Sequence, residues 1–119
     1  MSENMTATRL SGLHILRREI TRTKKRLAAL KNQKCQSAPT KRAIKNLEQK
    51  LEEYLIKSNE EAAELLNYIS SIDDLTVREI FMLRYYDGMR SWQRIAFNVG
   101  EHDESFVRRK HNAYLKKHE

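Results

Sequence analysis

The chain has 119 residues, of which 33% are charged, 3 are glycine and 1 is proline. So few turn-forming residues exclude a many-stranded β protein and favour an all-α fold, in one domain or in one small domain with an extension. The net charge of +7 favours a polyanionic partner such as nucleic acid.

The N-terminal part is expected to begin with a disordered tail over residues 1–8 and to continue as a long helix. From about Arg9 the apolar residues are spaced alternately by three and four, as in a heptad seam. The seam comprises Leu13, Leu16, Ile20, Thr23, Leu27 and Leu30. The other faces carry a basic run over residues 17–26, which comprises Arg17, Arg18, Arg22, Lys24, Lys25 and Arg26. This run is compatible with contact to DNA, contact to an acidic partner helix, or simple solvation.

A second helix is expected after the break at residues 34–41, where Pro39 fits a first helical turn and Ser37 or Thr40 can cap it. Its polar face is acidic. Its seam is predicted to comprise Ile44, Leu47 or Glu48, Leu51, Leu55, Ser58, Ala62, Leu65 and Ile69. A basic helix followed by an acidic one predicts an antiparallel, coiled-coil-like hairpin over residues 9–70. Pairing within one chain and pairing between two chains both satisfy the seam. We favour a homodimer, because two helices alone bury little surface.

Shorter helices are expected in residues 71–119, beginning with one through "VREIFMLRYY" that Asp73, Asp74 or Thr76 can cap. Its apolar face is predicted to comprise Val77, Ile80, Phe81 and Leu83 or Arg84. Gly88 supplies a left-handed stop, and Ser91 caps the next helix, which ends at Gly100. That helix is predicted to bury Trp92, Ile95, Ala96 and Val99. Asp103 caps a last helix over about 104–117, whose inward side chains are Val107, His111, Tyr114 and Leu115.

The last two helices have the features of a helix-turn-helix. Such a motif needs a small residue where the helices cross, a residue that tolerates positive φ at the turn, and an apolar anchor early in the second helix. Ala96, Gly100 and Val107 supply these three. The exposed start of the second helix offers groups for base edges and phosphates, namely Glu104, Ser105, Arg108 and Arg109. The alternative is a plain pair of amphipathic helices with solvated basic faces.

The stretch "LTVREIFMLRYYDGMRSWQRIAFNVGEHDESFVRRKHNAYLKK" resembles region 4 of sigma-70-type RNA polymerase sigma factors. It is most similar to small phage and prophage proteins that carry this module behind a helical N-terminus, some of which are late-gene transcriptional regulators. The resemblance covers about residues 74–117, a little over a third of the chain, and no counterpart of sigma region 2 is present. It implies a DNA-binding transcriptional regulator that is phage or prophage encoded, with RNA polymerase as a further partner.

The resemblance also implies roles for individual residues. Arg84 matches an arginine that contacts phosphate, and Ser91 and Gln93 open the helix that reaches the DNA backbone. The base-reading positions of the recognition helix are Glu104, Ser105 and Arg109, while Arg108 occupies a phosphate position. Lys116, later in the same helix, is a further candidate for DNA binding. Lys110 departs from the pattern, because it replaces an apolar anchor and can bury only its stem.

Other function classes find little support in the sequence. No Ser/His/Asp set, phosphate-cradling glycine loop or activated cysteine indicates an enzyme, and we expect no catalytic residues and no cofactor. The four histidines, His14, His102, His111 and His118, are too scattered for a zinc site. The single Cys35 excludes an intrachain disulfide and favours a reducing, cytoplasmic location. No apolar run is long enough to span a membrane, and the start of the chain has no signal-peptide pattern.

These observations predict a helical hairpin over residues 9–70 followed by a helix-turn-helix DNA-binding domain over residues 71–119. The expected function is sequence-specific binding of double-stranded DNA in transcription control. The alternative is a structural or assembly protein, for example in phage DNA packaging. In that case the hairpin mediates association, and DNA is bound without sequence preference.

Overall fold

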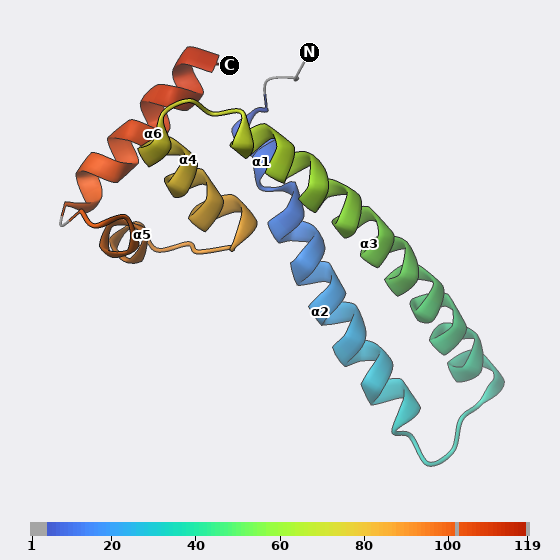
Figure 1. The fold of residues 1–119 in the computed structure, drawn as a ribbon. Helices are drawn as coiled ribbons and strands as arrows, with labels where there is room; N and C mark the ends of the chain where they lie inside the picture. The colour runs from blue at the N-terminus through green and yellow to red at the C-terminus, as the bar shows by residue number, and fades with distance from the viewer. Residues whose placement is uncertain (1–4, 102, 119) are drawn as a thin grey trace. The chain divides into compact units, whose positions relative to one another are not determined.

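The computed structural model describes residues 5–101 and 103–118, and in this part of the chain the regular secondary structure is entirely helical (Figure 1). The helices are α1 (Ala7–Leu10), α2 (Gly12–Lys31), α3 (Ala38–Ser70), α4 (Leu75–Phe81), the π-helical turn η1 (Met82–Tyr86), α5 (Trp92–Val99) and α6 (Glu104–His118). The predicted all-α fold is therefore confirmed. Residues 1–4 of the expected tail, and His102 and Glu119 of the expected DNA-binding domain, lie outside the described residues.

The chain divides into two compact units, and the division differs from the expected boundary between residues 70 and 71. One unit is the outer part of the hairpin, residues 15–60, and the other comprises the described residues before 15 and after 60. The reason lies in the core, because Leu10 and Leu13 belong to the same buried cluster as Ile69 and Ile80. The expected tail over residues 1–8 also needs correction, since Met5 is buried in this cluster and α1 begins at Ala7.

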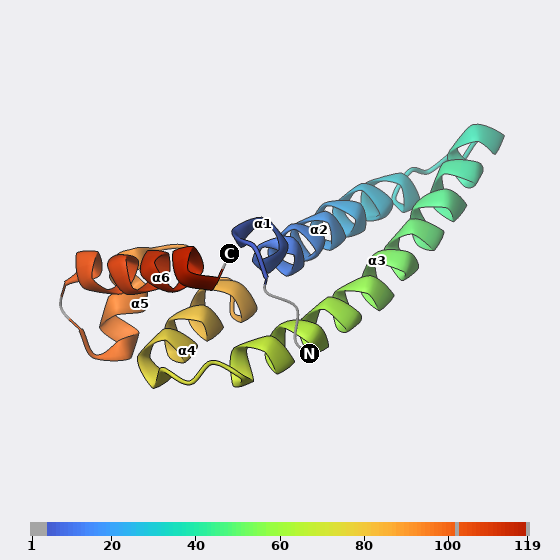
Figure 2. The ribbon, with the colours of Figure 1, turned by 90° about the horizontal axis from the view of Figure 1, so that it is seen from above.

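In the hairpin unit, α2 and α3 run antiparallel and are joined by the turn at residues 32–37 (Figure 1, Figure 2). The seam predicted for α2 is confirmed, because Ile20, Thr23 and Leu27 are buried. The seam predicted for α3 needs one correction, since Leu55 is 40% exposed while its neighbour Tyr54 is half-buried. The seven residues from Leu51 to Ser58 can be divided as four and three, through Leu55, or as three and four, through Tyr54. The structure has the second division.

The second unit has the main core. Its buried residues come from α1, the first turn of α2, the last turns of α3 and all the later helices. They are Met5, Leu10, Leu13, Leu65, Tyr68, Ile69, Ile72, Val77, Ile80, Phe81, Tyr85, Ile95, Ala96, Val107 and Leu115. Within this unit α6 packs on both α4 and α5. The core therefore fixes one face of α6 and leaves the opposite face in solvent.

The predicted helix boundaries follow from specific caps and turns. The Ser37 Oγ accepts a hydrogen bond from the Thr40 backbone N–H at the start of α3. At the start of α4 the Asp74 carboxylate accepts from the backbone N–H groups of Thr76 and Val77. Gly88 has φ +77°, as expected for a left-handed stop. The Ser37 cap therefore sets the start of α3, the Asp74 cap sets the start of α4, and Gly88 marks the end of η1.

Candidate nucleic-acid interface

The helix pair α5–α6 is built from a cap, a left-handed glycine and a second cap. The Ser91 Oγ accepts from the Arg94 backbone N–H at the start of α5. Gly100, with φ +82°, ends α5, and its N–H bonds back to the Phe97 carbonyl. The Asp103 Oδ1 then accepts from the Ser105 backbone N–H at 2.9 Å and opens α6. The sequence predicted all three features at these positions.

One face of α6 is held in the core. Val107, His111 and Leu115 are buried, as predicted, and Tyr114 is half-buried. The Tyr85 hydroxyl of η1 is hydrogen-bonded to the His111 Nε2 atom, which satisfies both polar groups inside an apolar cluster. Burial raises the pKa of Tyr85 and lowers the pKa of His111. Both groups are therefore neutral near pH 7, and the middle of α6 is fixed against η1.

The opposite face of α6 is polar and exposed, and it is called the α6 outer face here. It comprises Ser105, Arg108, Arg109, Asn112 and Lys116. These residues are spaced by three and four, which places them in one stripe along the helix. Four of them were predicted as DNA-binding residues, and Asn112 was not. The signal for Asn112 was present, because it lies four residues after Arg108 and four before Lys116.

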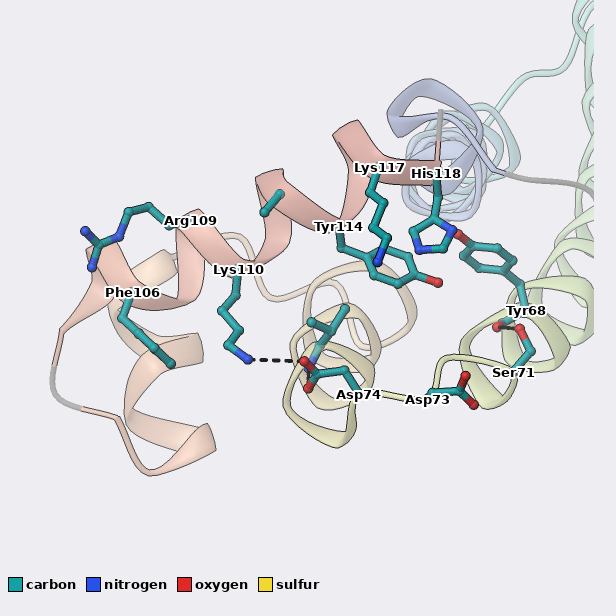
Figure 3. Close-up of a pocket in the computed structure, with 12 residues that line it drawn as sticks. Tyr68, Ser71, Asp73, Asp74, Phe106, Arg109, Lys110, Tyr114, Lys117 and His118 are labelled. Atoms are coloured by element: carbon teal, nitrogen blue, oxygen red, sulfur yellow. Dashed lines mark hydrogen bonds and ion pairs between the residues drawn. The ribbon is translucent and has the colours of Figure 1, made fainter.

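At the start of α6, Glu104 and Arg108 form an ion pair of 3.2 Å across one helical turn. Both side chains are about half exposed, so the pair has little influence on stability and can open for another partner. Arg109 has no ion pair within the described residues. Its guanidinium extends away from Asp74, whereas the neighbouring Lys110 reaches toward that residue (Figure 3).

Lys110 has a structural contact rather than a place on the outer face. Its Nζ lies 3.1 Å from the Asp74 carboxylate and 5.8 Å from the centre of the Phe106 ring. Lys110 is half-buried, which is compatible with the expectation that it buries part of its length where an apolar anchor is common. The contact joins α6 to the cap of α4, at the edge of a groove that Tyr68, Tyr114 and Lys117 also line (Figure 3).

Arg84 is fixed by its surroundings. Its guanidinium carbon lies 4.0 Å from the centre of the Trp92 ring, and its Nη1 donates to the Arg90 carbonyl at 3.2 Å. Burial lowers the pKa of Arg84, and the positive charges of Arg90 and Arg108 lower it further. Arg84 of η1 therefore lies close to Arg90, from the loop before α5, and within electrostatic reach of Arg108 on α6. These three arginines, Arg84, Arg90 and Arg108, are called the cationic cluster here.

The remaining predicted residues lie on α5. Ser91 and Gln93 are both exposed in its first turn. Further along the same helix, Arg94 is exposed and Phe97 is 81% exposed, and neither was predicted to contact a partner. The amphipathic pattern of α5 already placed Phe97 outside the core, because it follows the buried Ile95 and Ala96 on the polar side. A single exposed apolar side chain is common on protein surfaces, so Phe97 by itself assigns no partner.

Metal-binding groups and membrane-spanning helices are two further features that the described residues could have contained. No group of three or more His, Cys, Asp or Glu residues in this part of the chain is arranged to hold a metal ion. Among the described helices, none combines the length and the apolar character needed to cross a membrane. Comparison of the chain with protein-family profiles, with curated proteins and with solved structures found no significant match. The resemblance of residues 74–117 to sigma region 4 therefore stays a prediction from the sequence.

Proposed function

We propose that the chain is a sequence-specific DNA-binding transcriptional regulator of the sigma region 4 type, encoded by a phage or prophage. In this proposal α5 and α6 form a helix-turn-helix, and α6 is the recognition helix that enters the major groove. The observation that carries the proposal is the exposed polar stripe of α6, which comprises Ser105, Arg108, Arg109, Asn112 and Lys116. Exposed arginines and lysines in one stripe favour a polyanionic partner such as a phosphate backbone.

The two groups of residues have different tasks in this proposal. The cationic cluster contacts phosphates and fixes the register of the protein on the duplex, and Ser91 and Gln93 assist it from the first turn of α5. The residues of the α6 outer face other than Arg108 read base edges. Arg109 suits guanine, whose O6 and N7 accept two hydrogen bonds from one guanidinium. Asn112 suits adenine, because its amide can both donate and accept.

Two further partners belong to the proposal. The resemblance to region 4 implies RNA polymerase. The thin core of the two-helix hairpin, which leaves Leu55 and Ile56 exposed, favours a second copy of the chain, with two modules reading two half-sites. Light scattering of the full chain at micromolar concentration tests the second copy. A mass twice that of one chain supports it, and a monomer contradicts it.

The DNA-binding proposal is tested by single substitutions on α6. Arg109→Ala is expected to weaken binding to the preferred duplex by about 1–3 kcal/mol and to relax the preference at one position. Arg108→Ala is expected to weaken binding to all duplexes alike. Lys117→Ala is the matched control, because it removes one charge from an exposed position in the last turn of the same helix, outside the α6 outer face. Unchanged affinity and preference for Arg109→Ala would contradict the proposed recognition helix.

A further inference from the structure

A row of cations runs along the outer side of α2, within residues 15–60, all of which the structure describes. Arg18, Arg22 and Lys25 are exposed, and their spacing of four and three residues places them one above another on the helix. Lys24 and Arg26 flank the row and are also exposed. These five residues are called the α2 cationic face. The buried seam lies on the side of the helix opposite Arg18, Arg22 and Lys25, and all five side chains are exposed.

The acidic residues of α3 do not neutralise this face. Lys31 of α2 pairs with Glu48 of α3 at 3.9 Å, beyond the row. Arg22 contacts Glu19 of its own helix at 3.4 Å, and no ion pair within residues 15–60 reaches Arg18 or Lys25. The ion pairs Arg9–Glu64 and Lys31–Glu48 join the two arms of the predicted hairpin outside the row. From residue 15 to residue 31, α2 has seven Lys and Arg against one acidic residue.

Such an arrangement opposes helix stability, because like charges three and four residues apart repel. A polyanion relieves the repulsion. The surface also lacks what a protein interface needs at its centre, since between Arg18 and Lys25 the only large apolar side chain, Ile20, is buried. Long flexible cations without an apolar centre match a phosphate backbone, which requires positive charge and no particular sequence.

We propose that the α2 cationic face binds the sugar–phosphate backbone of duplex DNA without reading its sequence. It is a second contact surface, separate from the α6 outer face. The inference does not require sequence-specific binding by α6, because a phosphate contact is the same on every duplex.

The test uses the full chain with Arg18→Gln, Arg22→Gln and Lys25→Gln combined. Glutamine keeps helix propensity close to that of the residues it replaces, and circular dichroism verifies the fold. The matched control is Lys41→Gln, Arg42→Gln and Lys45→Gln, which removes the same charge from exposed positions of α3. Affinity for a random-sequence duplex is measured by fluorescence anisotropy over a range of salt concentrations. The readout is the slope of log affinity against log salt.

The row variant is expected to lower the magnitude of this slope by about 2 to 3, since each lost phosphate contact removes about 0.9. The control variant is expected to keep the wild-type slope. A wild-type slope in the row variant, or an equal decrease in both variants, would overturn the proposal. Binding of poly-L-glutamate tests the alternative that the face binds an acidic protein. If the wild-type chain binds poly-L-glutamate and the row variant does not, while the two have the same salt slope for DNA, the face belongs to an acidic protein. That result would also overturn the proposal.

Failure of the proposed function gives a different result. If α6 does not read sequence, the wild-type chain binds a duplex selected from a random-sequence library no more tightly than a random duplex. That result leaves the difference in salt slope between the row variant and the control, and so the assignment of the α2 cationic face, unaffected.

Discussion

The Tyr85 hydroxyl and the His111 Nε2 atom are hydrogen-bonded to each other between η1 and the middle of α6. On its other side, the His111 Nδ1 atom lies 2.9 Å from the Asn112 Oδ1 atom. The tautomer with a proton on Nδ1 donates to Asn112 and accepts from Tyr85, so all three groups are satisfied. The chain of bonds runs from the core to the α6 outer face and therefore links the stability of the unit to the placement of Asn112.

Removing the Tyr85 hydroxyl is expected to destabilise the protein. Tyr85→Phe keeps the ring in the core but leaves the buried His111 Nε2 atom without a partner, which typically costs about 1–3 kcal/mol. Urea unfolding followed by circular dichroism measures the change. Tyr54→Phe, at a half-buried position of α3, is the control and should change stability by less than about 0.5 kcal/mol. Equal effects of the two substitutions would show that the buried bond contributes nothing particular.

Stability is expected to fall as the solution becomes mildly acidic. Burial lowers the pKa of His111 below 6.5; the bond to Asn112 opposes this shift and the charge of Arg84 adds to it. The unfolded chain therefore binds a proton at a higher pH than the folded chain does. The contribution of His111 is complete above pH 6.5 and is lost progressively as the pH falls below that value. Urea unfolding at pH 7.5, 6.5 and 5.5 measures the loss.

His111→Phe removes the titrating group and should remove most of the pH dependence in this window, even if its stability at pH 7.5 is lower. His118→Gln, in the last turn of α6, should retain it. Equal wild-type stability at pH 7.5 and 5.5 would contradict the assignment.

The α4 cap is expected to matter more than the ion pair beside it. The Asp74 carboxylate accepts two backbone hydrogen bonds and also contacts Lys110. Asp74→Ala removes both interactions and should cost about 1 kcal/mol, whereas Asp74→Asn keeps a capping oxygen and should cost little. Asp73→Ala is the matched control. Comparable losses for the alanine and asparagine variants would mean that the ion pair with Lys110 dominates instead.

The turn between α5 and α6 requires glycine. Gly100 has φ +82°, so Gly100→Ala should cost about 1–2 kcal/mol through backbone strain, although no atom of the described residues lies within 4 Å of the added Cβ. Gly12 is helical, and the nearest atom to an added Cβ, the Glu61 Oε2, is 3.8 Å away, an ordinary contact. Gly12→Ala should therefore not destabilise. Thermal unfolding of both variants makes the comparison, and a stable Gly100→Ala protein would contradict the role of this turn.

Much of the fold followed from local rules in the sequence. Caps such as Ser91 and Asp103 and the stop at Gly100 depend on neighbouring residues, and the structure has them where they were predicted. The sequence placed Leu55 in the seam, and this prediction was wrong, because Tyr54 satisfies the heptad spacing equally and only the partner helix distinguishes the two. The burial of Met5 in the core could not be predicted from the sequence either, since it depends on contacts between distant parts of the chain.

The candidate site was also predictable only where its features lie within one helix. The stripe on α6 follows from helical spacing, and the sequence already places Arg108 and Arg109 together. The stacking of Arg84 on Trp92, by contrast, joins η1 to α5 and has no pattern within either segment. The buried pairing of Tyr85 with His111 spans 26 residues and was missed for the same reason: Tyr85 was not assigned to the core.

Selection of duplexes from a random-sequence library with the full chain, at near-physiological salt, tests the central claim most directly. If α6 reads base edges, sequencing of the retained duplexes should yield one enriched motif, and the Arg109→Ala chain should lose the preference at one position of it. Uniform recovery of all sequences would contradict sequence-specific recognition. That outcome would favour an assembly protein that associates through its hairpin and binds DNA without sequence preference.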